Sequence, residues 1–200
     1  MKTVVIVQAR YSSTRFPGKI LYKIGNKTLL EILLLRLKKS KLIDKIVVAC
    51  SDNKKDSDII NICVKNKFSY FIGSEFNVLD RFYKSALKYK AQNIVRVTSD
   101  CPLTDSKILD ELLKLFFKKK VDYASNLNPP SFPDGLDLEV FNFKSLKEAW
   151  KNSKKNEEKE HVTPYIINNK KFKKINFFNK KNYSKLRVTL DEKVDLYVLK

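Results

Sequence analysis

A chain of 200 residues, 43% of them hydrophobic, is long enough to bury a core of its own, so it needs neither disulfides nor a structural metal to fold. Lysine and arginine number 41 against 22 aspartates and glutamates, and the net charge of +19 favours phosphorylated or otherwise polyanionic partners. No known nucleic-acid-binding motif accompanies this charge, which is mostly scattered lysine. A solvated basic surface is therefore favoured over a specific nucleic-acid interface.

The cysteines and the apolar runs indicate a protein of a reducing compartment. The cysteines form no CxxC pair, and the only histidine, His161, is distant from them, which argues against a zinc site. We expect reduced, mostly buried thiols at Cys50, Cys63 and Cys101. The apolar stretch 3–7 is too short for the core of a signal peptide, and charged residues interrupt the leucine-rich stretch 29–37. We expect a cytoplasmic location and no membrane partner.

Strand and helix patterns alternate through the first part of the chain. The continuous β-branched run at 3–7 is typical of a strand covered on both faces. The predicted strands are residues 3–7, 45–49, 70–72 and 93–98, and the predicted helices are 28–39, 56–65, 78–89 and 106–117. This order predicts an α/β fold, a parallel sheet with helices on both faces, in which ligands bind at the carboxyl ends of the strands.

The second part of the chain is less regular. Its predicted strands are residues 121–125, 138–143, 172–177 and 186–190, and its predicted helices are 144–150, 157–168 and 192–200. We expect one domain over 1–200, with a nucleotide-binding half at 1–120 and an acceptor-binding half at 121–200. Because the last helical pattern reaches the final residue, we expect the native protein to be longer.

The loop that follows the first predicted strand carries three fixed cations, Arg10, Arg15 and Lys19, with hydroxyl groups between them. Arginine offers paired planar donors to phosphate oxygens, lysine offers a compact charge, and loop N–H groups near Gly18 can add contacts to an anion. The loop therefore suits a nucleoside triphosphate, although the charges alone are also typical of a basic surface loop. It contains neither the P-loop pattern GxxxxGK[ST] nor the dinucleotide pattern GxGxxG.

The order of residues in this loop, QARYSSTRFPGK at 8–19, resembles the signature loop of the cytidylyltransferases that make CMP-activated sugars. That family includes the CMP-Kdo and CMP-acylneuraminate synthetases, and the likeness is greatest to the spore-coat polysaccharide biosynthesis protein F type. Further similar segments follow in the same order: GSE at 73–75, VLDRFY at 78–83, RVTSDCPL at 96–103, PDGLDLEVF at 133–141, EHVTPY at 160–165 and LRVTLD at 186–191.

The resemblance implies a fold and a reaction. The fold is a mostly parallel, Rossmann-like sheet of the nucleotide-diphospho-sugar transferase (GT-A-like) kind, with a small β-rich subregion for the acceptor or the dimer contact. The reaction transfers CMP from CTP to a small sugar-like acid and releases pyrophosphate, with Mg²⁺ as cofactor, in surface polysaccharide or glycoconjugate biosynthesis. A homodimer is also implied.

The resemblance further assigns roles to residues of this chain. The implied catalytic residues are Arg10, Arg15, Lys19 and Asp100, and the implied metal ligands are Asp100 and Asp191. The implied CTP-binding residues are Gln8, Ala9, Arg10, Ser12, Ser13, Arg15, Lys19, Asp80 and Arg81. The implied acceptor-binding residues are Asp134, Gly135, Asp137, Glu139, Glu160, His161 and Thr163.

Residue chemistry leaves alternatives open at several of these positions. Asp80 and Arg81 could form an ordinary ion pair on a helix surface, Asp100 could cap a turn or a helix, and a single histidine is more often structural than functional. After Asp191, Glu-Lys stands where many relatives have a small residue followed by Pro-Glu. The resemblance therefore does not fix where the last helix begins.

Three other functions are weighed against this one. A nucleotidyltransferase that uses UTP or GTP usually opens with a glycine-rich GxGxR loop, which is absent here. A basic nucleic-acid-binding module without catalysis would explain the charge, but not the paired aspartates or the ordered motifs. An inactive relative would not be expected to keep every loop cation and both carboxylates.

Overall fold

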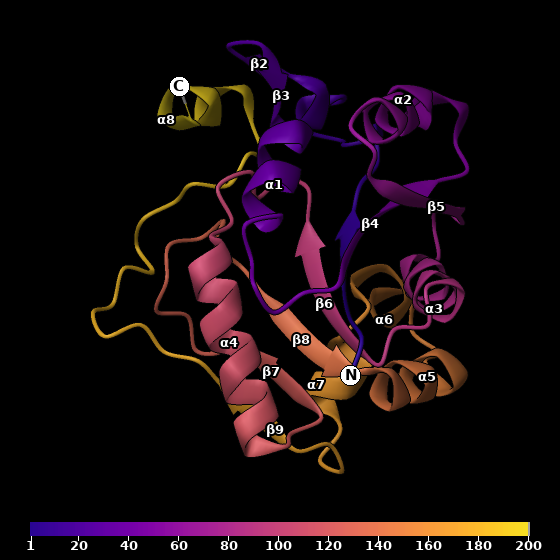
Figure 1. Ribbon diagram of the computed structural model, residues 1–200, viewed down its shortest axis with the longest axis vertical. Helices are drawn as coiled ribbons and strands as arrows, with labels where there is room; N and C mark the ends of the chain where they lie inside the picture. Colours follow the sequence, from indigo (N-terminus) through magenta and orange to yellow (C-terminus); the bar gives the residue numbers. More distant parts are fainter. Residues whose placement is uncertain (200) are drawn as a thin grey trace.

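The computed structural model describes residues 1–199, and its centre is a seven-stranded sheet with the strand order β5-β4-β1-β6-β8-β7-β9 (Figure 1). The strands are β1 (Thr3–Gln8), β4 (Lys45–Ser51), β5 (Ser69–Gly73), β6 (Asn93–Thr98), β7 (Tyr123–Ser125), β8 (Glu139–Asn142) and β9 (Lys174–Asn176). A separate two-stranded antiparallel sheet joins β2 (Lys23–Ile24) to β3 (Lys27–Thr28).

The predicted parallel sheet is confirmed. Strands β5, β4, β1 and β6 are parallel to one another, and in the β1–β6 register Gln8 lies opposite Thr98. The carboxyl ends of these two central strands therefore meet at one edge of the sheet. Strand β8 runs antiparallel to both β6 and β7, while β9 is parallel to β7, so the sheet is mixed in its second half.

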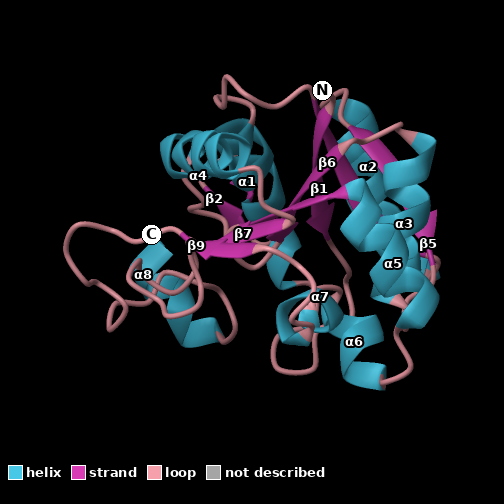
Figure 2. Cartoon of the chain, turned by 90° about the horizontal axis from the view of Figure 1, so that it is seen from below, coloured by secondary structure: helices cyan, strands magenta, loops and turns pink. Residues whose placement is uncertain are grey.

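Helices cover both faces of the sheet, as the alternating pattern predicts. The α-helices are α1 (Leu29–Leu37), α2 (Ser57–Lys65), α3 (Val78–Lys88), α4 (Ser106–Lys119), α5 (Phe143–Asn152), α6 (Asn156–His161), α7 (Pro164–Asn168) and α8 (Leu196–Leu199). Apolar residues of α1, α2 and α4 pack on one face, and those of α3, α5 and α7 pack on the other. Figure 2 shows α1 and α4 on one side of the sheet, with α3 and α5 on the opposite side.

Two elements of the second half were predicted wrongly. Residues 186–190 do not form a strand, and their one ladder contact within the described part of the chain is an isolated bridge between Asp134 and Arg187. The helix predicted over 157–168 is broken into α6 and α7, because Val162 adopts φ 71° and Pro164 starts a new helix. The other elements differ from the predictions mainly in their ends, and the last one begins as a short 3-10 helix, Lys193–Asp195.

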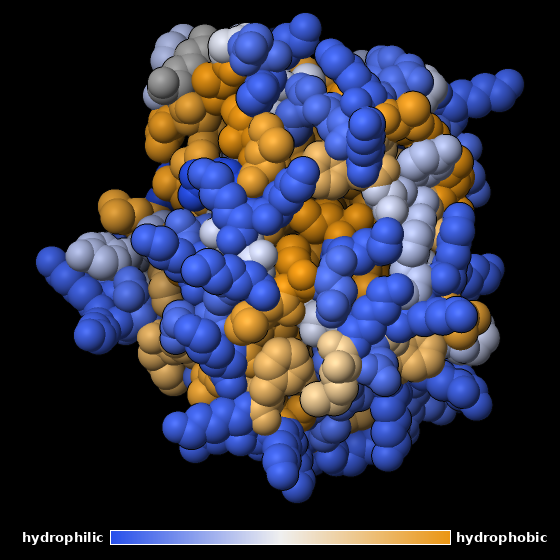
Figure 3. Space-filling view, in the orientation of Figure 1, coloured by the Kyte–Doolittle hydropathy of each residue, from blue (hydrophilic) through white to orange (hydrophobic). Residues whose placement is uncertain are grey.

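The surface is hydrophilic over most of the face drawn in Figure 3, and hydrophobic residues show in several areas between the hydrophilic ones. All three cysteines are free and buried, as predicted, and burial raises the pKa of the Cys101 thiol. Within residues 1–199, no helix combines the length and the apolar character that crossing a bilayer requires.

Candidate active site

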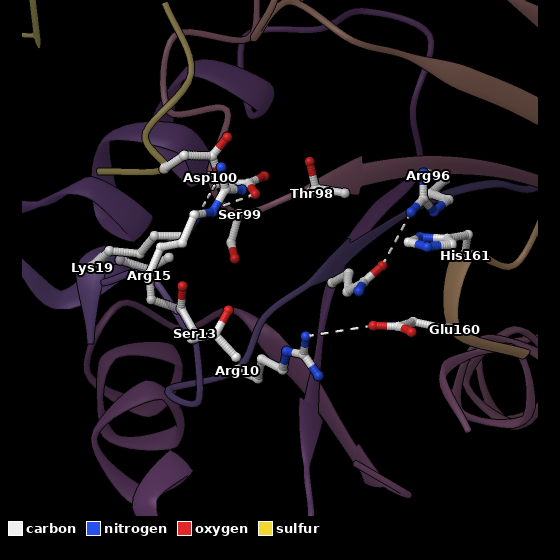
Figure 4. A pocket seen from close by; sticks show the side chains of 14 residues that line it. Arg10, Ser13, Arg15, Lys19, Arg96, Thr98, Ser99, Asp100, Glu160 and His161 are labelled. Carbon is white, nitrogen blue, oxygen red and sulfur yellow. Dashed lines mark hydrogen bonds and ion pairs between the residues drawn. The ribbon is translucent and has the colours of Figure 1, made fainter. Parts of the chain in front are cut away.

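A cavity of about 280 Å³ opens at the carboxyl ends of β1 and β6 (Figure 4). It receives side chains from the strand ends, from the loop at residues 10–19, which we call the cation loop, and from the α6 segment. The lining residues are Gln8, Arg10, Ser13, Thr14, Arg15, Lys19, Ile20, Arg96, Thr98, Ser99, Asp100, Glu160, His161 and Asp191. The predicted edge of the sheet is therefore the edge at which the candidate residues gather.

Lys19 lies at the centre of one end of this cavity. Its Nζ donates to Oδ2 of Asp100 at 3.3 Å, to Oδ1 of Asp191 at 3.0 Å and to the carbonyl oxygen of Leu190 at 2.5 Å. Arg15 forms a second ion pair with Asp191 at 2.8 Å. Burial alone would raise the pKa of Asp191, but the hydrogen bond and charge of Lys19, with Arg15, lower it below its usual value. Both carboxylates thus face one point, although they lie 91 positions apart in the chain (191 − 100).

Asp191 reaches Asp100 without the strand that the sequence predicts. The backbone carbonyl of Asp100 accepts from the N–H of Leu190 at 2.8 Å and from the hydroxyl of Thr189 at 3.1 Å. Gly135, with φ 102°, lets the loop that carries Asp134 lie against this segment. A Cβ at Gly135 would come within 2.5 Å of the backbone nitrogen of Thr189, so only glycine fits there.

The paired aspartates suit a divalent cation only if waters and phosphate oxygens of a bound substrate supply its other ligands. Among the described residues, no group of three or more His, Cys, Asp or Glu side chains lies together in a way that could hold a metal ion. Asp100 and Asp191 converge on one cationic atom, Lys19 Nζ. Mg²⁺ takes one or two carboxylates and completes its shell with waters and phosphate oxygens, and the two aspartates fit that demand.

Arg96 lies at the other end of the cavity, beside His161 and Glu160 (Figure 4). Its guanidinium pairs with Glu139 through Nη1 and donates to the Gln8 side chain through Nη2 at 3.3 Å. Sequence reasoning missed Arg96 together with Thr14, Ile20, Thr98 and Ser99. Polar side chains at alternate positions of the otherwise buried strand β6 were the signal that could have revealed Arg96 and Thr98.

Glu139 and Thr163, both predicted to bind the acceptor, lie behind the cavity rather than on it. Glu139 is 3% exposed, and its Oε1 accepts from the hydroxyls of Tyr123 and Thr163, each at 2.7 Å. Their observed contacts hold Arg96 in place. A buried acidic group with several donors of this kind fixes the orientation of the cation that it pairs with.

A strained turn places Glu160 and His161 at the cavity. Val162 is fully buried and has φ 71° and ψ −50°, and the N–H of Thr163 donates to the carbonyl of His161 at 2.8 Å. This is a γ-turn in its rare positive-φ form, which is costly for a β-branched residue. Strain of this kind is concentrated at functional sites. Glu160 in turn pairs with Arg10 of the cation loop at 3.8 Å.

The remaining predicted residues lie outside the cavity lining: Ala9, Ser12, Asp80, Arg81, Asp134, Gly135 and Asp137. The Ala9 N–H is engaged by the carbonyl of Ala49 at 3.2 Å. Asp80 pairs with Lys84 at 2.8 Å and accepts from the Trp150 indole at 2.9 Å.

Arg81 and Ser12 form hydrogen bonds outside the cavity. Arg81 is fully buried and donates through Nη1 to the carbonyl of Ser74 at 2.7 Å, while its Nε and Nη2 find no partner among residues 1–199. The Ser12 hydroxyl donates to Glu75, which also accepts from Asn53 at 2.9 Å. The hydrogen bonds from Ser12 and Asn53 lower the pKa of Glu75, so this carboxylate is ionised at neutral pH.

Burial, with the charges of Asp134, Glu139 and Asp100, raises the pKa of Asp137 from 3.8 to about 6. Because the pKa in the folded state lies above the unfolded value, ionisation costs stability, and the full cost is present above about pH 6 and absent below about pH 4. We expect Asp137→Asn to raise the free energy of unfolding by about 3 kcal/mol at pH 8 and by only about 0.5 kcal/mol at pH 4.

Urea denaturation at the two pH values measures this difference, with the exposed Asp58→Asn as the matched control. An equal effect of Asp137→Asn at both pH values would show that the carboxyl is not held in its neutral form.

Comparison with known proteins gives the family. A cytidylyltransferase family model matches residues 4–197. The chain belongs to the cytidylyltransferase family. This cytidylyltransferase is 35% identical over 203 residues to the spore coat polysaccharide biosynthesis protein SpsF of Bacillus subtilis, covering 98% of this chain and 83% of that protein. It is 42% identical over 194 residues to an uncharacterized protein of Methanocaldococcus jannaschii, covering 96% and 79%.

Solved structures show the same fold. A cytidylyltransferase from Leptospira borgpetersenii matches this cytidylyltransferase with a TM-score of 0.96 and 37% identity, covering 100% of this chain and 85% of that one. A CMP:2-keto-3-deoxy-manno-octonic acid synthetase complexed with CTP matches with a TM-score of 0.76 and 15% identity, covering 100% and 97%. The second likeness concerns the fold alone, and it confirms the predicted Rossmann-like nucleotidyltransferase sheet.

Proposed function

We propose that this cytidylyltransferase transfers CMP from CTP to a hydroxyl of a small sugar-like acid, with release of pyrophosphate and with Mg²⁺ as its cofactor. The observation that carries the proposal is the convergence of Arg10, Arg15 and Lys19 with the carboxylates of Asp100 and Asp191 in one cavity. Three cations suit the polyphosphate, and two carboxylates suit the cation that accompanies it.

In the proposed complex, the cation loop receives the triphosphate. Arg10 and Arg15, whose side chains are 35% and 57% exposed, offer donors to the β- and γ-phosphates, and Lys19 faces the reacting α-phosphate. Asp100 and Asp191 would hold the metal, which would neutralise phosphate charge. Lys19, whose Nζ donates to both carboxylates, would place its charge beside the phosphate groups.

The proposed chemical step is an in-line displacement. An acceptor hydroxyl oxygen bonds to the α-phosphorus and gives up its proton to water. The bond from that phosphorus to the bridging oxygen breaks, and pyrophosphate leaves with the electron pair. Lys19 and Arg15 stabilise the charge that develops on the phosphate oxygens, and the fixed cavity holds the reactants in position. The side chains of this chain thus act by positioning and by charge, without a covalent intermediate.

We assign the acceptor to the end of the cavity lined by Arg96, Glu160 and His161. The guanidinium of Arg96, fixed by Glu139, suits a carboxylate of the acceptor. We further propose that residues 1–120 form the nucleotide-binding half and residues 121–200 the acceptor-binding half of one domain, with two exceptions. Arg96 of the first half reaches the acceptor end of the cavity, and Asp191 of the second half reaches the nucleotide end. A role in surface polysaccharide biosynthesis, a homodimer and a cytoplasmic location complete the proposal.

The direct test is pyrophosphate release with each of CTP, UTP, GTP and ATP, in the presence of Mg²⁺ and a panel of sugar acids, followed by phosphorus NMR of the products. We expect turnover with CTP and a CMP-linked product with at least one acid. Faster turnover with UTP or GTP would show that this nucleotide, and not CTP, is the preferred substrate. The test is needed because the cavity residues alone do not identify the base.

A further inference from the structure

One buried carboxylate, that of Asp56, is not used by the site described above. Asp56 is fully buried at the end of a 3-10 helix, Lys54–Asp56, and stands at the N-cap position of α2. An aspartate in that position usually accepts from a backbone N–H two or three residues further on. The Asp56 side chain makes no such hydrogen bond, so capping of α2 does not explain its orientation.

Both oxygens of Asp56 accept hydrogen bonds from other parts of the chain. Oδ1 accepts from the backbone N–H of Tyr11 at 2.7 Å, across 45 positions of sequence. Oδ2 accepts from the N–H of Ser51 at 2.8 Å and from its hydroxyl at 2.7 Å. The carboxylate therefore ties the start of the cation loop to the end of β4, the strand that pairs with β1.

Tyr11 is the residue on which the cation loop closes. Its carbonyl oxygen accepts from the N–H groups of Ser13 and Gly18, both at 2.9 Å. Gly18 has φ +70°, and a Cβ there would come within 2.9 Å of the Tyr11 ring. Lys19 follows directly. A contact that holds the Tyr11 N–H therefore restrains the residue whose carbonyl and ring contact Gly18, and with it the backbone that carries Lys19.

We propose that Asp56 is a positioning residue of the nucleotide site, which holds the cation loop closed before the nucleotide arrives. A carboxylate is needed because both of its oxygens accept backbone N–H groups, whereas asparagine offers only one acceptor oxygen. A buried N–H left without an acceptor is costly, so the loop would open to satisfy Tyr11 with water. A loop already closed loses less conformational freedom when it binds.

The test compares Asp56→Ala and Asp56→Asn with Ser51→Ala, which removes one donor to Asp56 without touching the cation loop. CTP dissociation constants are measured by calorimetry, and thermal unfolding is recorded for each variant. We expect Asp56→Ala to weaken CTP binding about tenfold or more and Asp56→Asn to be intermediate. Ser51→Ala should lose stability but bind CTP within about twofold of the unaltered chain.

Equal CTP affinity of Asp56→Ala and the unaltered chain would overturn the proposal, and so would an equal loss of affinity in Ser51→Ala. The expected change in CTP affinity rests on the proposed function, whereas the hydrogen bond from the Tyr11 N–H to Asp56 does not. Amide hydrogen exchange of the unaltered, ligand-free protein tests the tie alone. Strong protection of the Tyr11 amide from exchange is expected. Exchange at the rate of an unstructured chain would refute the hydrogen bond between Tyr11 and Asp56, and this result does not depend on whether the variants fold. If the unaltered chain does not bind CTP but its Tyr11 amide is protected from exchange, the proposed function is contradicted and the hydrogen bond between Asp56 and Tyr11 is supported.

Discussion

Replacement of Asp100 by asparagine is expected to lower the rate of pyrophosphate release from CTP by about a thousandfold or more while leaving the fold intact. The amide keeps the size of the side chain but cannot neutralise a cation. The backbone carbonyl of Asp100, which holds Leu190 and Thr189, is untouched, so Asp191 keeps its position. The loss should therefore fall on turnover rather than on stability.

Initial rates at saturating CTP and Mg²⁺ measure the effect, and thermal unfolding shows whether the variant is folded. The matched control is Glu111→Gln, which changes an exposed carboxylate on α4 that pairs with Lys114. Full activity of Asp100→Asn would remove Asp100 from the metal site. Asp191→Asn should behave alike, with an added loss of stability because Arg15 and Lys19 lose their shared partner.

Lys19→Met is expected to lower kcat/KM for CTP by about a hundred- to a thousandfold. Lys19 is 8% exposed, and methionine is also unbranched but is one atom shorter and carries no charge. The variant leaves two carboxylates facing each other without their shared donor, so it should also be less stable in the absence of Mg²⁺ and regain stability when the metal is added. Lys19→Arg is not expected to restore activity, because a planar guanidinium presents its donors in a different geometry from the single ammonium on which three oxygen acceptors converge.

Steady-state kinetics and thermal unfolding with and without Mg²⁺ distinguish these effects. Lys23→Met serves as the control, since Lys23 is an exposed lysine near the same loop. An unchanged kcat/KM in Lys19→Met would exclude contact between Lys19 and the reacting phosphate. A loss of stability that Mg²⁺ does not reverse would argue against a metal between the two aspartates.

The first half of the fold could be predicted because its signals are local. Buried strands such as β1 and β4 contain continuous apolar runs, and their alternation with helices restricts the topology to a few choices. The cation loop could be predicted from the order of its residues, and the structure brings Arg10, Arg15 and Lys19 to one cavity.

The parts that were missed depend on contacts that no local pattern records. The apolar alternation at 186–190 is typical of a strand, yet the segment lies against Gly135 and Asp100 instead of joining the sheet. The break near Val162 was signalled by Pro164, which has no N–H to continue the hydrogen bonds of one helix and is favoured in the first turn of a new one. The roles of Arg96 and Asp56 follow from partners 43 and 45 positions away, and residue type alone does not identify those partners.

The central claim is that the cation loop holds the triphosphate of CTP beside a metal shared by Asp100 and Asp191. A crystal structure of the protein with CTP and Mg²⁺ measures this directly. The account predicts phosphate oxygens within hydrogen-bonding distance of Arg10, Arg15 and Lys19, and one Mg²⁺ with an oxygen ligand from each aspartate. A triphosphate bound elsewhere, or a metal that contacts neither carboxylate, would contradict it.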